Sequence, residues 1–307
     1  MKNAVVLGSK GQDGRLLSAL LESRGYRVTG VDARPEELDI TSEPQVIGFL
    51  REAKPDEVYH LAAIHHSAEE TPDRATRTTQ KACEVNLLSL VYWLEGIRQV
   101  SPSTRLFYAA SSHVFGEAAS EVQDESTPLN PGSLYGLTKA GGMLACRMYR
   151  QSHGLFASTG ILYNHESSLR PVGFLSKKVV RGALEIRAGL RKQLALGSLS
   201  AIGDWGYAAD YVEAMHRILN HRRSDDFVVA TGERHTVQDF VRVAFELVGV
   251  DWKRYVIEDR SIPLRKNPGH IGNPAKLMRE TGWRPSVGFE DMIRKLIEAE
   301  EKAWRRI

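Results

Sequence analysis

Two side chains four residues apart could carry out proton transfer. Tyr135 and Lys139 lie in a segment with helical periodicity, 133–153, so they share one helix face. An ammonium group beside a phenol favours the ionised phenol, which can then accept a proton from a hydroxyl group. Ser111 directly follows an apolar run, 104–110, and could hydrogen-bond the same hydroxyl oxygen. These residues predict oxidation of an alcohol if a dinucleotide-binding fold precedes them.

A glycine-rich segment near the first residue indicates such a fold. The apolar run over 3–8 predicts a buried strand, and the helical segment 11–24 follows at once. Glycines at this junction let the backbone turn tightly and approach a pyrophosphate, which the positive end of the helix stabilises. The residues that we expect to contact the cofactor here are Gly8, Gly11, Gln12, Asp13 and Gly14.

The end of the second predicted strand indicates which dinucleotide binds. Asp32 lies where a carboxylate can accept hydrogen bonds from both ribose hydroxyls and repel a 2′-phosphate. NAD is therefore favoured over NADP, although Arg34 could pair with a 2′-phosphate. Asp39 and Ile40 come next, and they either meet the adenine edge or form a helix-capping turn.

Short apolar runs alternate with helical segments through the first half of the chain. The runs lie at 3–8, 26–31, 57–63, 104–110 and 155–162, and the helical segments at 11–24, 43–53, 80–100 and 133–153. This alternation predicts an α/β fold, a doubly wound parallel sheet of the Rossmann type. We expect an NAD-binding domain over 1–165, to which later segments could return, and a smaller substrate lobe over 166–307.

The composition argues against several other classes of protein. The chain has 41 Lys and Arg against 38 Asp and Glu, spread along its length, so we expect no nucleic-acid surface. It has no apolar stretch of roughly 18 residues, the length of a membrane span, and no leader pattern is visible. Cys83 and Cys146 have no metal-ligand spacing, so we expect two free thiols and no metal. Free thiols, together with the lack of a leader pattern and of an apolar span, lead us to expect a cytoplasmic protein.

Motifs from the first half of the chain resemble those of one enzyme superfamily. The glycine loop, LAA at 61–63, FG at 115–116 and the Ser111, Tyr135 and Lys139 set together resemble the extended short-chain dehydrogenases/reductases. Each motif is weak alone, but their order along the chain is specific. The resemblance implies that the LAA residues Leu61, Ala62 and Ala63, together with Tyr135 and Lys139, contact the cofactor.

Longer blocks in the second half narrow the resemblance. NHES at 164–167 and DWGYAADYVEAM at 204–215 are similar to blocks of GDP-mannose 4,6-dehydratases. That family implies a nucleotide-sugar substrate and a homodimer or dimer of dimers, with helices 80–100 and 133–153 packing as a four-helix bundle. It also implies a set of substrate-binding residues, which are His65, Ser112, His113, Asn164, Lys177, Trp205 and Arg260.

The chain departs from that family where the reaction type is decided. His113 stands at the position of the family's glutamate, which removes the C5 proton of the sugar and assists loss of the C6 hydroxyl. Histidine has a suitable pKa for proton transfer, yet it could instead only hydrogen-bond the substrate or be structural. After the third strand, Ile64-His65-His66 stands where the family has Gln-Ser-His. Arg260 is retained from another family motif, whose glutamate this chain lacks.

These residues leave several reactions open after a shared first step. Tyr135 would take the proton of the sugar 4-hydroxyl while C4 gives hydride to NAD. The loss of the glutamate favours a 4-epimerase or related C4 redox enzyme that dehydrates GDP-mannose poorly. The alternative is a 4,6-dehydratase that uses His113, and a remote one is a nucleotide-sugar sensor without catalysis.

Overall fold

Six parallel strands form the central sheet of the computed structural model, which describes residues 1–32, 38–65, 75–259, 261–262 and 270–304. The strand order is β11-β6-β4-β3-β1-β2, and every neighbouring pair is parallel. The strands are β1 (Asn3–Leu7), β2 (Arg27–Val31), β3 (Glu57–His60), β4 (Arg105–Ser111), β6 (Ala157–Leu162) and β11 (Asp226–Val229). Most of their residues are buried, as expected for a sheet covered on both faces.

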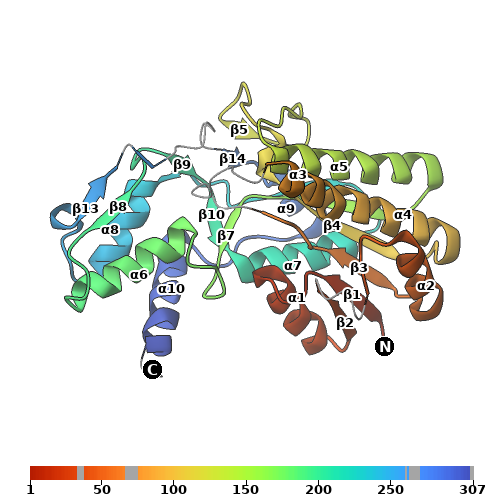
Figure 1. The fold of residues 1–307 in the computed structure, drawn as a ribbon, viewed down its shortest axis with the longest axis horizontal. Helices are drawn as coiled ribbons and strands as arrows, with labels where there is room; N and C mark the ends of the chain where they lie inside the picture. Colours follow the sequence, from red (N-terminus) through yellow and green to blue (C-terminus); the bar gives the residue numbers. More distant parts are fainter. Residues whose placement is uncertain (33–37, 66–74, 260, 263–269, 305–307) are drawn as a thin grey trace.

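Helices cover both faces of this sheet, which confirms the predicted doubly wound fold (Figure 1). One face packs against α2 (Glu43–Ala53), α4 (Ser89–Val100) and α5 (Leu134–His153). The other packs against α1 (Gln12–Ser23), α7 (Ala208–Leu219) and α9 (Ala275–Thr281). Segments beyond residue 165 therefore return to the sheet, since α7, β11 and α9 all follow it in the chain.

Two elements differ from the sequence prediction for one physical reason. The third strand ends at His60 rather than at residue 63, and the helix predicted over 80–100 contains a wide π turn, η1 (Glu84–Leu88), between α3 (Ala75–Cys83) and α4. The buried Asn86 on that turn bonds to both backbone groups of Ile64. These bonds tie the segment that follows β3 to the π turn, so the strand ends and the helix widens around the same side chain.

A smaller lobe has a hydrophobic core of its own, at the left of Figure 1. It contains α6 (Leu175–Arg187), α8 (Val237–Leu247) and α10 (Phe289–Trp304). Two-stranded sheets flank them: β8 (Leu194–Leu196) with β13 (Val256–Glu258), and β9 (Ile202–Gly203) with β12 (His235–Thr236).

Two further strand pairs lie between the lobe and the central sheet. They are β7 (Asn164–Glu166) with β10 (Trp205–Tyr207), and β5 (Val122–Gln123) with β14 (Ile271–Gly272). The single-turn 3-10 helices η2 (Ser112–Val114) and η3 (Trp252–Arg254) complete the elements of the described chain. Within those residues, no helix is both long enough and apolar enough to cross a membrane.

Candidate active site

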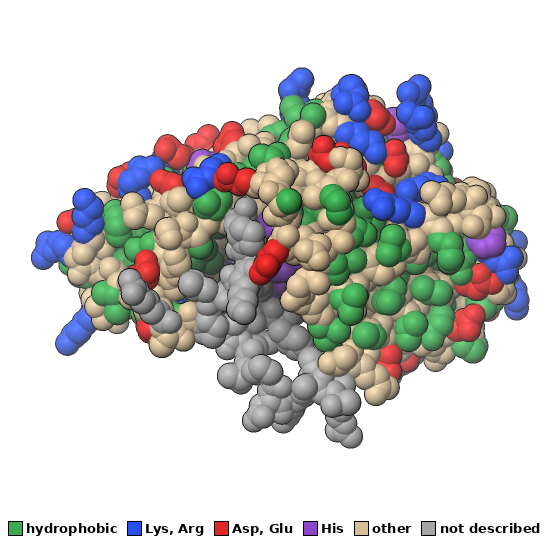
Figure 2. Space-filling view, turned by 90° about the horizontal axis from the view of Figure 1, so that it is seen from above, with side chains coloured by type: hydrophobic (Ala, Val, Ile, Leu, Met, Phe, Trp, Pro, Cys, Tyr) green, Lys and Arg blue, Asp and Glu red, His purple; other side chains and the backbone are tan. Residues whose placement is uncertain are grey.

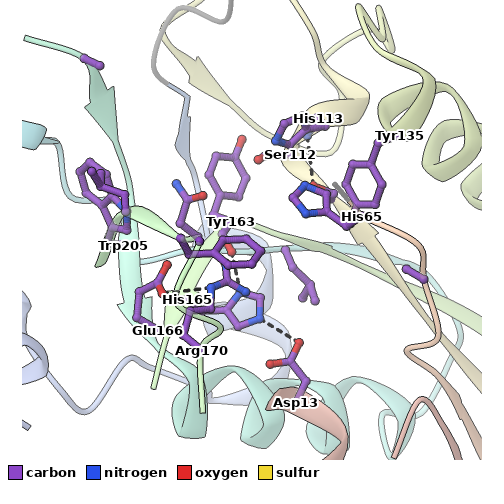
Figure 3. A pocket seen from close by; sticks show the side chains of 18 of the residues that line it. Asp13, His65, Ser112, His113, Tyr135, Tyr163, His165, Glu166, Arg170 and Trp205 are labelled. Carbon is purple, nitrogen blue, oxygen red and sulfur yellow. Dashed lines mark hydrogen bonds and ion pairs between the residues drawn. The ribbon is translucent and has the colours of Figure 1, made fainter. Parts of the chain in front are cut away.

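A cavity of about 440 Å³ lies where the central sheet meets the smaller lobe. Many residues singled out from the sequence line it: Asp13, Leu61, Ala63, His65, Ser111, Ser112, His113, Tyr135, Lys139, Asn164 and Trp205. The sequence interpretation missed other lining residues, among them Tyr163, His165, Glu166, Arg170, Phe174 and Lys178. Figure 3 shows Tyr135, His65 and His113 at one end and Trp205 at the other.

Lys139 lies beneath the Tyr135 ring at the wall of the cavity. Both side chains come from the first turns of α5, where Ser133 caps the helix by accepting a hydrogen bond from the Gly136 amide at 3.1 Å. The ammonium nitrogen of Lys139 is 5.7 Å from the centre of the Tyr135 ring and donates to the Ala109 carbonyl at 2.8 Å. Burial lowers the pKa of Lys139 to about 7.

Three rings gather at this end of the cavity. The His65 ring lies edge-on to the Tyr135 ring with centres 4.4 Å apart, and the His113 ring is 5.6 Å from the same phenol. The two imidazoles are 6.2 Å from each other. Ser111, the last residue of β4, accepts a hydrogen bond from the His113 amide at 3.4 Å, which starts the short helical turn that carries His113. The predicted Ser111, His113 and Tyr135 therefore share one compartment.

Asn86 connects the segment that carries His65 to the helix that carries Tyr135. Its amide oxygen accepts from the Ile64 amide at 2.7 Å, and its nitrogen donates to the Ile64 carbonyl at 3.0 Å. The same nitrogen donates to the Thr138 hydroxyl at 3.2 Å. Sequence analysis did not identify Asn86, because a lone asparagine in a helical segment carries no distinguishing signal.

The first turn of α1 is bonded to the NHES segment. The Asp13 carboxylate lies 2.9 Å from His165 Nε2, and the Gln12 side chain donates to the His165 carbonyl at 3.1 Å and accepts from Ser167 at 2.9 Å. Burial alone would raise the pKa of Asp13 and lower that of His165. Their mutual attraction outweighs it, so the pKa of Asp13 is lowered and that of His165 is raised. These contacts give the predicted cofactor residues Gln12 and Asp13 a role in joining the two halves of the cavity.

Cationic side chains line the lobe side of the cavity. Arg170 is paired with Glu166 at 3.1 Å, and its guanidinium carbon lies 4.0 Å from the centre of the Phe174 ring. Lys178, one turn into α6, also lines the cavity. The predicted Lys177 lies outside it, because its ammonium pairs with Glu300 on α10. Two cations on one wall suit a diphosphate.

The glycine loop has the close backbone packing that a dinucleotide site requires. Gly8 has a φ of +84°, and a Cβ added there would lie 3.0 Å from the Ala62 backbone. A Cβ on Gly14 would lie 2.2 Å from the Gly8 carbonyl oxygen. Gly11 donates its amide to that same oxygen at 3.1 Å. The loop and the start of α1 therefore fit a pyrophosphate, and Ala62 supports the loop from behind.

The residues predicted for the adenosine end lie outside the cavity. The Asp32 carboxylate accepts from the Ser9 hydroxyl at 2.5 Å and the Lys10 amide at 3.0 Å, so it lies against the glycine loop. The Asp39 side chain accepts a hydrogen bond from the Thr41 amide at 2.8 Å, as expected for the capping turn that the sequence offered as an alternative. Ile40 packs against the core of the sheet. The predictions that concern Arg34, His66 and Arg260 fall outside the described residues.

The Rossmann sheet, the glycine loop and the Ser-Tyr-Lys set define an enzyme of the extended short-chain dehydrogenase/reductase class. The family model for GDP-mannose 4,6 dehydratase matches residues 35–296. GDP-mannose 4,6 dehydratase 2 of Arabidopsis thaliana is 34% identical over 99% of this chain and 88% of its own length. The chain belongs to the GDP-mannose 4,6-dehydratase family, which confirms the resemblance.

Solved structures show the same fold. RMD from Pseudomonas aeruginosa, complexed with NADPH, matches with a TM-score of 0.85 at 20% identity, over 99% of this chain and 100% of its own. A UDP-glucose 4-epimerase from Thermus thermophilus, in complex with NAD, matches with a TM-score of 0.82 at 26% identity, over 98% and 99%. Both NAD and NADPH thus occur among the similar structures.

Proposed function

We propose that this protein oxidises a nucleotide-sugar at C4 of the sugar, with Tyr135 as the base. The observation that carries this proposal is the position of Tyr135 in the cavity wall, above the buried Lys139 ammonium and in the same cavity as Ser111. The cation favours the phenolate, which takes the proton of the 4-hydroxyl. Ser111 donates a hydrogen bond to the same oxygen as it becomes a carbonyl. NAD, when bound, would supply the hydride acceptor for C4 and later the hydride donor.

We propose 4,6-dehydration as the reaction that follows, in place of the 4-epimerisation that the sequence favoured. Membership in the GDP-mannose 4,6-dehydratase family supports this choice. A C4 carbonyl acidifies the C5–H bond, so a base at C5 and an acid at the C6 hydroxyl complete the loss of water. Addition of a hydride to C6 and of a proton to C5 would then saturate the C5–C6 bond. His113, 5.6 Å from the Tyr135 ring in the same wall, is our candidate for the proton transfers at C5 and C6.

A 4-epimerase is the second candidate, and two observations favour it. The Thermus thermophilus UDP-glucose 4-epimerase shares 26% identity over nearly the whole chain. His113 is also an imidazole where the family carries a carboxyl group, and an imidazole must reorient to exchange a proton between C5 and the C6 oxygen. In that reaction the hydride returns to the opposite face of C4.

We propose NAD as the cofactor and the cationic wall as the diphosphate site. Asp32, beside the glycine loop, would repel a 2′-phosphate, which favours NAD over NADP. Arg170 and Lys178 line the cavity opposite the sheet, where a diphosphate could reach them while the sugar meets Tyr135. This arrangement supports a nucleotide-sugar substrate and leaves the base of the nucleotide open.

We propose a homodimer formed through α5 and η1, the turn that precedes α4. Large hydrophobic side chains are exposed there: Leu137, Leu144 and Met148 on α5 and Leu88 on η1. Leu137, Leu144 and Met148 are seven and four residues apart, which is the spacing of one helix stripe. Figure 2 shows hydrophobic side chains gathered on this face. A second copy that packs the same stripe against it would remove this surface from water.

The two reactions are separated by turnover of GDP-mannose with NAD in deuterated water, followed by NMR. Dehydration predicts a 4-keto-6-deoxy product with solvent deuterium at C5. A product epimeric at C4, with hydrogen retained at C5, would overturn dehydration and support the second candidate. A panel of GDP-, ADP-, CDP- and UDP-sugars in the same assay identifies the nucleotide, and no change in any of them would contradict the enzyme function altogether.

A further inference from the structure

A row of stacked side chains spans the cavity from the smaller lobe to Tyr135. The Arg170 guanidinium lies 4.0 Å from the Phe174 ring centre, and Phe174 stacks on His65 at 5.8 Å with 17° between the ring planes. His65 in turn meets Tyr135 edge-on at 4.4 Å. All four side chains line the same cavity.

The row joins elements that belong to different cores. Phe174 is the residue that precedes α6, whose buried face packs in the core of the smaller lobe, and Arg170 is in the loop before it. His65 follows β3 and Tyr135 is on α5, and both of these elements pack in the core of the central sheet. The Phe174–His65 contact is therefore a contact between the two walls.

His65 is held in place independently of Phe174. The preceding residue, Ile64, has its amide and carbonyl bonded to the buried Asn86 side chain at 2.7 and 3.0 Å. Phe174 is likewise held by Arg170, which is paired with Glu166. The backbone before His65 and the ring of Phe174 therefore each have a partner outside the stack, which supports the stack from both walls.

The chemistry of the proposed function, on which this inference rests, needs such a wall. Once C4 has lost hydride, the oxidised sugar must stay in the cavity until the hydride is returned. If it leaves early, the reduced dinucleotide remains on the enzyme and the next cycle cannot begin. We propose that Phe174 and His65 are positioning residues that close the side of the sugar compartment and retain the oxidised intermediate.

The first test measures retention without any reaction. In the Tyr135→Phe background, which lacks the base, stopped-flow measures the rate at which GDP-mannose leaves the NAD-loaded protein. Adding Phe174→Ala should raise this rate about tenfold, the effect of losing a ring contact of this kind. Phe174→Tyr, which keeps the ring, should stay within about threefold of the parent. Equal rates for the Ala and Tyr variants, with NAD affinity retained, would overturn the proposal.

The second test uses the active protein with GDP-mannose and follows absorbance at 340 nm. Phe174→Ala should accumulate reduced dinucleotide, up to one per active site, and release the keto sugar, whereas wild type should not. Added NAD should restart the stalled variant. A variant that is slower yet completes as many cycles as wild type would overturn retention while leaving the proposed function intact. A wild-type protein inert toward GDP-mannose would instead count against the proposed function. The dissociation rates of the first test would still show whether Phe174 and His65 retain the bound sugar.

Discussion

Replacing Gly14 by alanine tests whether the glycine loop binds the dinucleotide. A Cβ at this position would lie 2.2 Å from the Gly8 carbonyl oxygen, 2.6 Å from Ser9 Cα and 2.8 Å from the Ser9 carbonyl carbon. All three are backbone atoms, so no side chain can rotate away. The turn between β1 and α1 must shift by about 1 Å to restore ordinary contact distances.

The size of the effect follows from the precision that the site needs. A displacement of about 1 Å in a positioning element can cost roughly 100-fold, or about 2.7 kcal/mol. We therefore expect the dissociation constant for NAD to rise at least about 100-fold in Gly14→Ala. The helix itself should remain, because alanine is favourable within a helix.

Gly48→Ala is the matched control, since Gly48 lies within α2 and a Cβ there would meet nothing within 4 Å. It should bind NAD as wild type does and gain up to about 1 kcal/mol of stability from helix propensity. Isothermal titration calorimetry gives the affinity, and circular dichroism gives the fold of each variant. Affinity within threefold of wild type in a folded Gly14→Ala protein would refute the assignment of the loop.

Four further predictions address the remaining parts of the account. Tyr135→Phe should lower kcat by roughly 10³-fold with NAD affinity unchanged, and a loss below tenfold would identify another base. Asp32→Ser should reduce the preference for NAD over NADP about tenfold, and wild-type protein that already prefers NADP would contradict the assignment. Leu144→Glu should lower the mass in light scattering to that of the 34.3 kDa monomer, whereas a wild-type monomer would rule out the dimer. The pKa of His165 is raised, so the contribution of this imidazole to stability is complete below pH 6.5 and is lost at higher pH. The pKa of Asp13 is lowered, so the contribution of this carboxylate is complete above about pH 4 and is lost in acid. Asp13→Asn should therefore lower the free energy of unfolding most between about pH 4 and 6.5, and a loss independent of pH would argue against an ion pair.

The central sheet and one end of the site were accessible from sequence because they depend on local patterns. Alternating apolar runs and helical segments determine a parallel sheet, and the carboxyl ends of its strands bring Ser111, His113 and Tyr135 to one edge. The spacing of Tyr135 and Lys139 required only that α5 be a helix.

The other wall of the site depends on tertiary packing that no local pattern encodes. Arg170 and Phe174 precede α6 in an irregular segment, and only the packing of the smaller lobe brings them to the cavity. Lys177 and Lys178 are adjacent lysines, and the sequence does not show which of them faces the cavity. Lys177 pairs with Glu300 on α10, and Lys178 lines the cavity. The π turn around Asn86 was missed because one wide turn scarcely changes the apolar periodicity of a long helix.

Turnover of GDP-mannose labelled with deuterium at C4 tests the central claim most directly. If the protein oxidises C4 and then dehydrates the sugar, the deuterium leaves C4 and is recovered at C6, in the methyl group of the 4-keto-6-deoxy product. NMR of the product locates the label, and Tyr135→Phe serves as the control in which no label moves. A product that still carries the deuterium on C4 would contradict 4,6-dehydration, and inversion at C4 in that product would identify the epimerase instead.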